Sequence, residues 1–345
     1  MSIQERVSGG FQPGRRKAVS VDSSALVKSG FLVPEDRFLL VLEPNMEGVD
    51  LVSWARSQRE ALERQLLAHG GILFRGFSVG SAQQFQDVAR AICEDLIDYN
   101  ERAAPRNEVE KSVYTSTEFP ADQHIPMHHE MSYAHNWPTK IWFYCAQPPA
   151  ERGRTPVADD RKVLNRIDPA IRRRFVEKKV MYVRNYGEGV DLPWQEAFQT
   201  DDPAVVEEYC RKARMTFEWK DKNRLRTRTI RPATVQHPKT GDTIWFNHAH
   251  MFHVSNLQPS VREVLLAEFR EDELPRNAFY GDGSPIEPSV LEEIRGVYEE
   301  VALRFDWQQG DILMLDNFLS SHGREPFAGP RKILVAMGEL FTSQE

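Results

Sequence analysis

The chain has 345 residues, 41% of them hydrophobic and 28% charged, which is typical of a globular protein and not of a disordered one. Its formal net charge of −7 argues against general binding to nucleic acid or acidic membranes, because both need a basic surface. No apolar run reaches the ~18 residues of a membrane span, and residues 1–17 lack the apolar segment of a signal peptide. Cys93, Cys145 and Cys210 lie far apart, which excludes a CxxC zinc site and favours a reducing cytoplasm. We expect a cytoplasmic protein.

The first hundred residues are predicted to hold two helices with one strand between them. Residues 50–68 repeat apolar side chains at helical spacing and stop before Gly70 and Gly71, which favour a helix end. Residues 72–74 then predict a short buried strand. Residues 81–96 predict a second helix, with one apolar face.

From about residue 112 the pattern changes to short β-rich segments bounded by Gly, Pro or Asp. These are residues 141–145, 180–184, 229–235, 243–246, 312–315 and 333–340. Strands spread this widely predict a sheet built from distant parts of the chain, as in a jelly roll.

Further helices are predicted between these strands. Residues 168–179 and 202–212 each begin with Asp-Pro, which supplies an N-cap followed by the proline favoured at the first helical position. Residues 261–269 and 288–304 also have helical spacing.

The sequence therefore predicts an α+β fold with a mainly β core. Residues 1–20 are polar and glycine-rich, and we expect a flexible leader there. No repeat or low-complexity linker divides the remainder. We expect a single domain over residues 21–345, with an insertion at about 160–310.

The histidines are the residues most suggestive of chemistry. His128 and Glu130 are two positions apart, so on an extended backbone both side chains point the same way and could reach one ion. His322 follows a strand-like segment and could supply a third ligand. Two histidines and one carboxylate leave open positions that suit Fe(II) and O₂ chemistry. A histidine and a glutamate at this spacing also occur by chance, so a packed or exposed His128 is the alternative.

An arginine stands nine residues after His322, beyond a turn rich in glycine and proline. This turn would return Arg331 on a neighbouring strand toward His322. A buried arginine can hold a carboxylate through two parallel hydrogen bonds, as a dicarboxylate bound to the metal at its other end would need. A surface salt bridge is the alternative reading of Arg331.

These segments resemble the Fe(II)/2-oxoglutarate-dependent oxygenases of the taurine dioxygenase-like superfamily, and most of all its clavaminate synthase-like branch. The resemblance runs in order from about residue 35 to the end of the chain. It is carried by GGILFRGF (70–77), YTSTEFPADQHIPMHHEMSYAHNWP (114–138), RGRTPVAD (152–159), WFNHAHMFH (245–253) and LDNFLSSHGREPFAGPRKIL (315–334).

The resemblance implies a double-stranded β-helix (jelly roll) flanked by helices. It implies that His128, Glu130 and His322 bind Fe(II), and that Arg331 and Thr155 hold the co-substrate 2-oxoglutarate. The implied reaction consumes O₂, converts 2-oxoglutarate into succinate and CO₂, and hydroxylates an unactivated C–H bond. Desaturation or cyclisation would use the same residues.

Two positions depart from the family pattern. The carboxylate ligand is Glu130 where much of the superfamily has Asp, although the clavaminate synthase-like branch tolerates Glu. The family often has a second arginine four residues after the first, and that position is Val335 here. Arg324 could replace it, or could be a surface residue.

We expect the remaining histidines to have supporting roles. His129 would point away from the two ligands on a strand, which favours packing or a supporting role behind the ligands. His248, His250 and His253 could form a second metal site, but the aromatic residues between them favour a pocket wall.

Two other classes of protein would explain the same residues. A non-oxidative protein could hold Zn²⁺ on the same ligands for hydrolysis or structure, and would not need Arg331 or Thr155. A metal-free binding protein could use the same pocket.

The resemblance implies a small-molecule substrate, an amino acid or a derivative made in natural-product biosynthesis, either free or tethered to an acidic carrier protein. Residues 151–231 contain 20 basic and 14 acidic residues in an otherwise acidic chain. Such a region could attract a carrier protein through Arg224, Arg226 and Arg228. An ordinary solvated surface is the alternative.

Overall fold

The computed structural model describes residues 26–97, 108–116, 119–187 and 192–343. The leader expected at residues 1–20 lies outside them. Within the described ranges, no helix combines the length and apolar character needed to cross a membrane.

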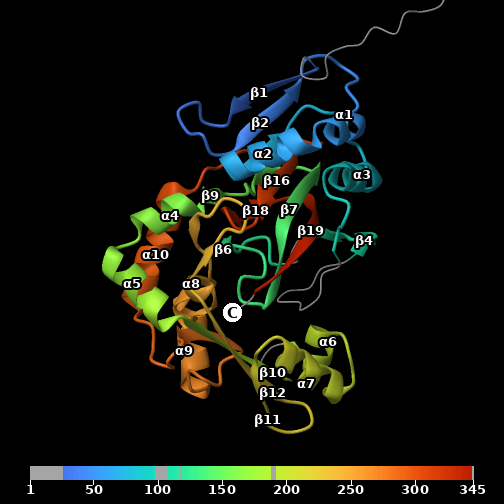
Figure 1. Ribbon diagram of the computed structural model, residues 1–345. Helices are drawn as coiled ribbons and strands as arrows, with labels where there is room; N and C mark the ends of the chain where they lie inside the picture. Colours follow the sequence, from blue (N-terminus) through green and yellow to red (C-terminus); the bar gives the residue numbers. More distant parts are fainter. Residues whose placement is uncertain (1–25, 98–107, 117–118, 188–191, 344–345) are drawn as a thin grey trace, which may run out of the picture.

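One large sheet forms the framework of the protein (Figure 1). All of its neighbouring strands run antiparallel except the parallel pair β2 and β3. Its eight strands lie in the order β1 (Val27–Phe31), β2 (Leu40–Pro44), β3 (Gly71–Phe74), β16 (Ile312–Asp316), β7 (Asn136–Gln147), β19 (Lys332–Thr342), β5 (Val113–Thr115) and β4 (Glu108–Glu110).

The two faces of this sheet bury different layers because side chains alternate along a strand. On β7, Trp142 and Tyr144 pack into one hydrophobic cluster with side chains of α1 (Leu51–Ser57), α2 (Arg59–His69) and α3 (Ala82–Ile92). Phe143 and Cys145 belong to the cluster on the opposite face. That opposite face is the one turned toward the smaller sheet.

The smaller sheet contains β6 (Ile125–His128), β17 (Ser320–Arg324) and β9 (Val157–Asp159), with β17 in the middle. Two short pairs accompany it, β8 (Glu151–Arg152) with β18 (Phe327–Ala328) and β13 (Thr234–Gln236) with β14 (Thr243–Trp245). Two mainly antiparallel sheets packed over a common core match the predicted jelly roll.

The region expected as an insertion holds most of the remaining helices and a four-stranded sheet. The sheet order is β11 (Thr216–Trp219), β12 (Leu225–Arg231), β10 (Val180–Tyr186) and β15 (Arg276–Tyr280). The helices are α4 (Asp160–Arg166), α5 (Pro169–Lys178), α6 (Trp194–Phe198), α7 (Pro203–Lys212), α8 (Ala249–Phe252), α9 (Pro259–Glu268) and α10 (Pro288–Val301), with a 3₁₀ turn at Val254–Asn256. The predicted Asp-Pro starts are confirmed: Asp168 caps α5 and Asp202 caps α7.

Three predicted elements are wrong in detail. The helix expected at 50–68 is two helices that meet at Gln58, where the Ser57 hydroxyl donates to the Trp54 carbonyl. The helix expected at 81–96 ends at Ile92, and Leu96 pairs with β19 instead. The strand expected at 229–235 is divided between β12 and β13, because Pro232 has no N–H to continue a ladder.

Candidate active site

The structure brings His128, Glu130 and His322 together, although 192 residues separate Glu130 from His322 in the chain. One ligand atom from each lies within 4.8 Å of the others, a spacing at which one ion can contact all three. This is the single such group of His, Cys, Asp and Glu within the described ranges. Glu130 and His322 are buried, whereas His128 is partly exposed.

The two histidines face each other across neighbouring strands. His128 ends β6 and is the register partner of His322 on β17, and their ring centroids are 4.5 Å apart. The Nδ1 of His128 lies 2.8 Å from the Pro126 carbonyl oxygen, so Nδ1–H donates there. The Nε2 of His128 is then the atom with a lone pair for a metal.

Glu130 does not lie on a strand, contrary to the expectation. It follows β6 in a turn, and Met131 after it has a positive φ of 61°. Asn317 fixes this turn: its Oδ1 accepts from the Glu130 N–H over 2.8 Å, and its Nδ2 donates to the Glu130 carbonyl over 2.9 Å. Backbone hydrogen bonds, and not strand alternation, therefore place the carboxylate.

His322 is held from the large sheet and from the insertion. The Phe143 ring of β7 lies 4.8 Å from the His322 ring. The preceding residue, Ser321, donates its N–H to the buried carboxylate of Asp160 over 2.6 Å, and Tyr298 donates its hydroxyl to the same carboxylate over 3.1 Å. Asp160, the first residue of α4, therefore fixes the backbone beside His322.

Arg331 contacts the short segment of the chain that carries Thr155. The Nε of Arg331 donates to the Gly153 carbonyl over 3.3 Å. Thr155 is buried, and its hydroxyl accepts from Nε1 of Trp307 over 3.0 Å. A hydroxyl that accepts one bond still has its own proton to donate.

The charge of Arg331 is largely enclosed by protein. Burial and then the nearby charge of Arg324 lower the pKa of Arg331 to about 10, so it remains a cation at neutral pH. Among the described residues, no carboxylate lies within ion-pair distance of it. Such a cation suits an anionic ligand.

One expectation about Arg331 is wrong. It precedes β19, which pairs with β7 and β5 in the large sheet and not with β17. The large and small sheets approach each other instead, as the Phe143–His322 contact shows.

The second departure from the family pattern, the valine at position 335, has a structural explanation. Val335 is buried in the apolar core, where an arginine would lack a polar partner. Arg324 is not a surface residue: it is buried and donates to the carbonyls of Phe119, Pro120 and Gln123. It thereby holds the 119–123 loop, and its hydrogen bonds give it a structural role there.

The other histidines form a buried wall beside the triad. His248 contacts the Ser132 hydroxyl, and its ring centroid lies 5.7 Å from that of His128. The pKa of His248 lies well below its ordinary value because burial disfavours the cation, with His128 adding repulsion. His250 bonds the Met127 carbonyl and His253 bonds Ser255. These contacts support a wall rather than a second metal site.

His129 is directed away from the triad, as expected. Its Nε2 lies 3.3 Å from Oδ2 of Asp160, and its ring packs against Phe246 with centroids 4.5 Å apart. His129 and His322 therefore both depend on Asp160 for their surroundings.

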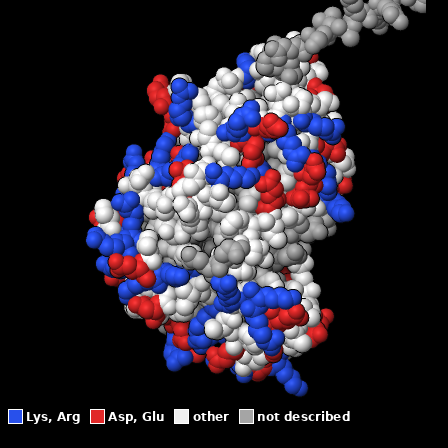
Figure 2. Space-filling model, in the orientation of Figure 1, with Lys and Arg blue, Asp and Glu red and all other residues white. Residues whose placement is uncertain are grey.

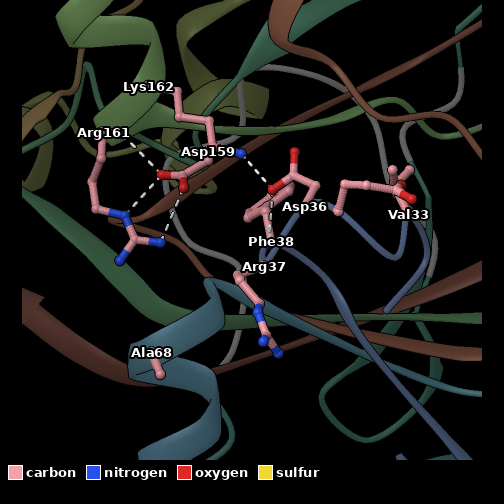
Figure 3. Close-up of a pocket in the computed structure, with 9 residues that line it drawn as sticks. Val33, Asp36, Arg37, Phe38, Ala68, Asp159, Arg161 and Lys162 are labelled. Carbon is pink, nitrogen blue, oxygen red and sulfur yellow. Dashed lines mark hydrogen bonds and ion pairs between the residues drawn. The ribbon is translucent and has the colours of Figure 1, made fainter. Parts of the chain in front are cut away.

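A separate hollow of about 420 Å³ lies beside the end of β9 (Figure 3). Four of the charged side chains that line it form two ion pairs, Arg161 with Asp159 over 2.8 Å and Lys162 with Asp36 over 2.5 Å. None of the five candidate site residues lines it. It is distinct from the candidate active site.

Three supporting residues were missed by the sequence analysis. Asn317, Asp160 and Trp307 each make their contact with residues more than 130 positions away in the chain. The only sequence signal was a polar Asp-Asn pair after the strand at 312–315.

A jelly roll that carries two histidines and one carboxylate on neighbouring segments is the arrangement typical of non-haem iron oxygenases. Residues 38–337 match the family described as taurine catabolism dioxygenase TauD, TfdA family. The chain belongs to this family, which confirms the resemblance to Fe(II)/2-oxoglutarate-dependent oxygenases and shows that the protein is an enzyme.

Two curated relatives share most of the chain. The dapdiamide synthesis protein DdaC of Enterobacter agglomerans is 42% identical over 276 residues, covering 80% of this chain and 84% of DdaC. A clavaminate synthase-like protein of Arabidopsis thaliana is 32% identical over 293 residues, covering 82% of this chain and 85% of that protein.

Solved structures share the fold at low identity. PvcB of Pseudomonas aeruginosa superposes with a TM-score of 0.55 over 94% of each chain, at 17% identity. A taurine dioxygenase of Burkholderia xenovorans superposes with a TM-score of 0.52 over 91% of this chain and 89% of its own, at 14% identity. These likenesses confirm the jelly-roll fold.

Proposed function

We propose that this enzyme binds Fe(II) through His128, Glu130 and His322 and uses 2-oxoglutarate and O₂ to hydroxylate a C–H bond of an amino-acid-derived small molecule. The observation that carries the proposal is the triad itself, whose ligand atoms lie within 4.8 Å of one another. Two imidazoles and one carboxylate are the donor set expected for non-haem Fe(II).

The protonation of His128 also fits the binding of Fe(II). His128 donates Nδ1–H to Pro126, which leaves Nε2 as the ligand atom. Asn317 holds the Glu130 backbone, and Phe143 packs on the His322 ring. When bound, the iron would supply O₂ activation coupled to decarboxylation of 2-oxoglutarate.

Arg331 and Thr155 would hold the distal carboxylate of 2-oxoglutarate. The guanidinium can offer two parallel N–H donors, and the Thr155 hydroxyl can donate a third bond while Trp307 satisfies it as an acceptor. The buried aromatic side chains around the triad limit water there, which strengthens these charge-assisted bonds.

The relatives bear on the class of substrate. DdaC is named for dapdiamide synthesis, and PvcB is described as an Fe, alpha-ketoglutarate dependent oxygenase from an isonitrile synthetic pathway. Both names point to small-molecule biosynthesis. They support a biosynthetic amino-acid derivative as substrate and leave desaturation or cyclisation as alternative outcomes on the same residues.

A finer proposal is that the substrate is tethered to a carrier protein. The contacts of the three arginines decide which of them can be changed to test it. Arg226 is buried and donates to Asn185 over 2.8 Å and to Asp272 over 3.2 Å. Arg224 pairs with Asp221. Figure 2 shows blue and red residues interleaved over the lower part of the molecule, where Figure 1 places α6, α7 and β11.

Carrier docking is tested best by reversing charge at Arg224 and Arg228 and sparing Arg226, whose loss would disturb the sheet. The R224E/R228E double variant should slow turnover of a tethered substrate and leave a free one unchanged. If the double variant turns over the tethered substrate as fast as the wild type does, this region is an ordinary solvated surface.

The decisive experiment for the proposed function is anaerobic metal analysis followed by a 2-oxoglutarate consumption assay. We expect one equivalent of Fe(II) to bind and 2-oxoglutarate to be converted into succinate only when O₂ is admitted. Tight zinc binding without 2-oxoglutarate turnover would favour a non-oxidative zinc protein. No metal binding at all would favour a metal-free binding protein.

A further inference from the structure

The guanidinium of Arg331 lies over the aromatic ring of Phe327. Its central carbon is 5.4 Å from the centre of that ring, within the ~6 Å at which the face of an aromatic ring attracts a cation. The guanidinium carbon of Arg324 lies 5.2 Å from the same ring centre. Two cations therefore share one ring. The charge of Arg324 opposes that of Arg331, and the electron-rich ring offsets this repulsion.

Gly153 holds both Phe327 and Arg331 in place. The Gly153 N–H donates to the Pro326 carbonyl over 3.0 Å, and the Gly153 carbonyl accepts from Nε of Arg331 over 3.3 Å. Gly153 has a positive φ of 69°, and a Cβ atom there would lie 2.7 Å from the Cβ of Phe327, which is too close for two carbon atoms. Only glycine lets the backbone pass this near to Phe327. One backbone position thus fixes the ring and the guanidinium relative to each other.

The other end of the Arg331 guanidinium is open to a ligand. Within the described residues, Nη1 and Nη2 of Arg331 have no hydrogen-bond or ion-pair partner. Two parallel N–H donors of this kind match the two oxygens of a carboxylate. The Nε bond and the ring restrict the guanidinium, so the direction of these donors is set before a ligand arrives, and less freedom is lost on binding.

The chain that carries Gly153 continues directly to the candidate metal centre. Thr155 is two residues further on, and Val157 is the register partner of the metal ligand His322. One short run of chain therefore joins the backbone anchor of Arg331, the second residue assigned to the co-substrate and one metal ligand. This continuity places the ring and the guanidinium beside the same site.

We propose that Phe327 is a positioning residue, whose ring holds the Arg331 guanidinium in the orientation that receives the distal carboxylate of 2-oxoglutarate. The inference rests on the proposed function, because it deepens the role given there to Arg331. Phe327 acts through Arg331 and needs no contact with the co-substrate. Loss of the ring should therefore weaken binding of that carboxylate and leave the metal site as it is.

The test compares two ligands that differ only at the distal carboxylate. Calorimetric titration of the Mn(II)-loaded protein without O₂ measures the affinity for 2-oxoglutarate and for 2-oxopentanoate, which keeps the oxo-acid end and has a methyl group in place of the distal carboxylate. F327L removes the aromatic face and keeps an apolar side chain. It should weaken 2-oxoglutarate binding about fivefold or more and leave 2-oxopentanoate binding unchanged. A general loosening of the site would weaken the binding of both ligands.

Two further variants test whether the ring acts through Arg331. F327Y keeps the aromatic face and should bind 2-oxoglutarate as the wild type does. R331Q should lose the preference for 2-oxoglutarate over 2-oxopentanoate. The double variant R331Q/F327L should bind 2-oxoglutarate no more weakly than R331Q alone, because the ring would have no cation left to position.

F31L is the matched control. Phe31 of β1 lies under the guanidinium of Arg37, whose central carbon is 4.9 Å from its ring centre. F31L therefore makes the same change beneath an arginine that has no part in the candidate site, and should leave the affinity for 2-oxoglutarate unchanged. Thermal unfolding and Mn(II) titration establish that every variant is folded and binds the metal.

The proposal is overturned if F327L binds 2-oxoglutarate as tightly as the wild type, or if it loses affinity for both ligands to the same degree. It is also overturned if F327L weakens binding further in the R331Q background. If R331Q abolishes the preference for 2-oxoglutarate and F327L keeps it, the proposed function stands and the role of Phe327 is wrong. If the wild type itself shows no preference for 2-oxoglutarate, the role of Arg331 in the proposed function fails as well.

Discussion

The side chain of Asn317 holds both backbone polar groups of Glu130, accepting from its N–H over 2.8 Å and donating to its carbonyl over 2.9 Å. The same Nδ2 also donates to the Pro138 carbonyl over 2.9 Å. One buried amide therefore joins the end of β16 to the turn that carries the carboxylate and to the start of β7. A metal ligand that lies on a turn depends on such support more than a ligand within a strand does.

Asn317→Ala should therefore weaken metal binding without removing a ligand. Losing the amide leaves buried backbone groups of Glu130 unsatisfied, at about 1–3 kcal/mol of unfolding free energy for each such group. Loss of a group that orients a ligand typically lowers metal affinity by about 10–100-fold. Calorimetric titration with Mn(II) and urea unfolding measure the two effects. Asn256→Ala is the control, since its Nδ2 also bonds a backbone carbonyl but away from the triad; equal metal affinity in both variants would contradict the assignment.

Glu130→Ala should abolish coupled turnover, because it removes the one charged ligand of the triad. We expect metal affinity to fall steeply and 2-oxoglutarate consumption to drop to background. Glu151→Ala, at an exposed position of β8, provides the control for loss of a glutamate. Near-normal hydroxylation by Glu130→Ala would require a different ligand set.

Arg331→Ala should raise the KM for 2-oxoglutarate while iron binding stays near normal. Losing a charge-assisted contact costs about 1.5–3 kcal/mol, which corresponds to roughly 10–150-fold. Steady-state kinetics at saturating substrate gives the KM, and equilibrium titration gives the metal affinity. The exposed Arg152→Ala variant should behave as wild type. An unchanged KM would exclude Arg331 as the residue that holds the co-substrate.

Stability should fall as the pH drops below about 6.5. Burial lowers the pKa of His250 to about 3 and that of His253 to about 4, from an ordinary value of 6.5. Between these limits the unfolded chain takes up protons that the folded protein does not, so acid favours unfolding. Each histidine contributes up to about 1.4 kcal/mol per pH unit.

Urea unfolding between pH 7.5 and pH 5 measures this effect. His250→Gln should make the dependence of the unfolding free energy on pH shallower, because one of the two proton-binding groups is gone. A slope identical to that of wild type would mean that His250 is protonated in the folded protein as readily as in the unfolded chain.

The sequence was informative where chemistry is carried by few, rare residues. His128, Glu130 and His322 stand out by type and spacing, and the Asp-Pro helix starts follow from local capping alone. Asn317 did not stand out, because its role depends on a partner 187 residues away. The break at Gln58 was equally hidden, since the apolar spacing continues across it with neither Gly nor Pro. Pro232, by contrast, was visible and could have predicted the division of the 229–235 strand.

The position of β19 has a consequence for how the protein is made. This strand is the last of the strands that the structure describes, yet it lies between β7 and β5 in the large sheet. Until it is inserted, β7 and β5 each present an open edge of unpaired backbone groups. Open edges of apolar strands invite pairing with other chains, and contacts between distant segments form slowly. Chains in which β19 has not yet been inserted are therefore prone to aggregate, and low temperature or chaperones should improve the yield of folded enzyme.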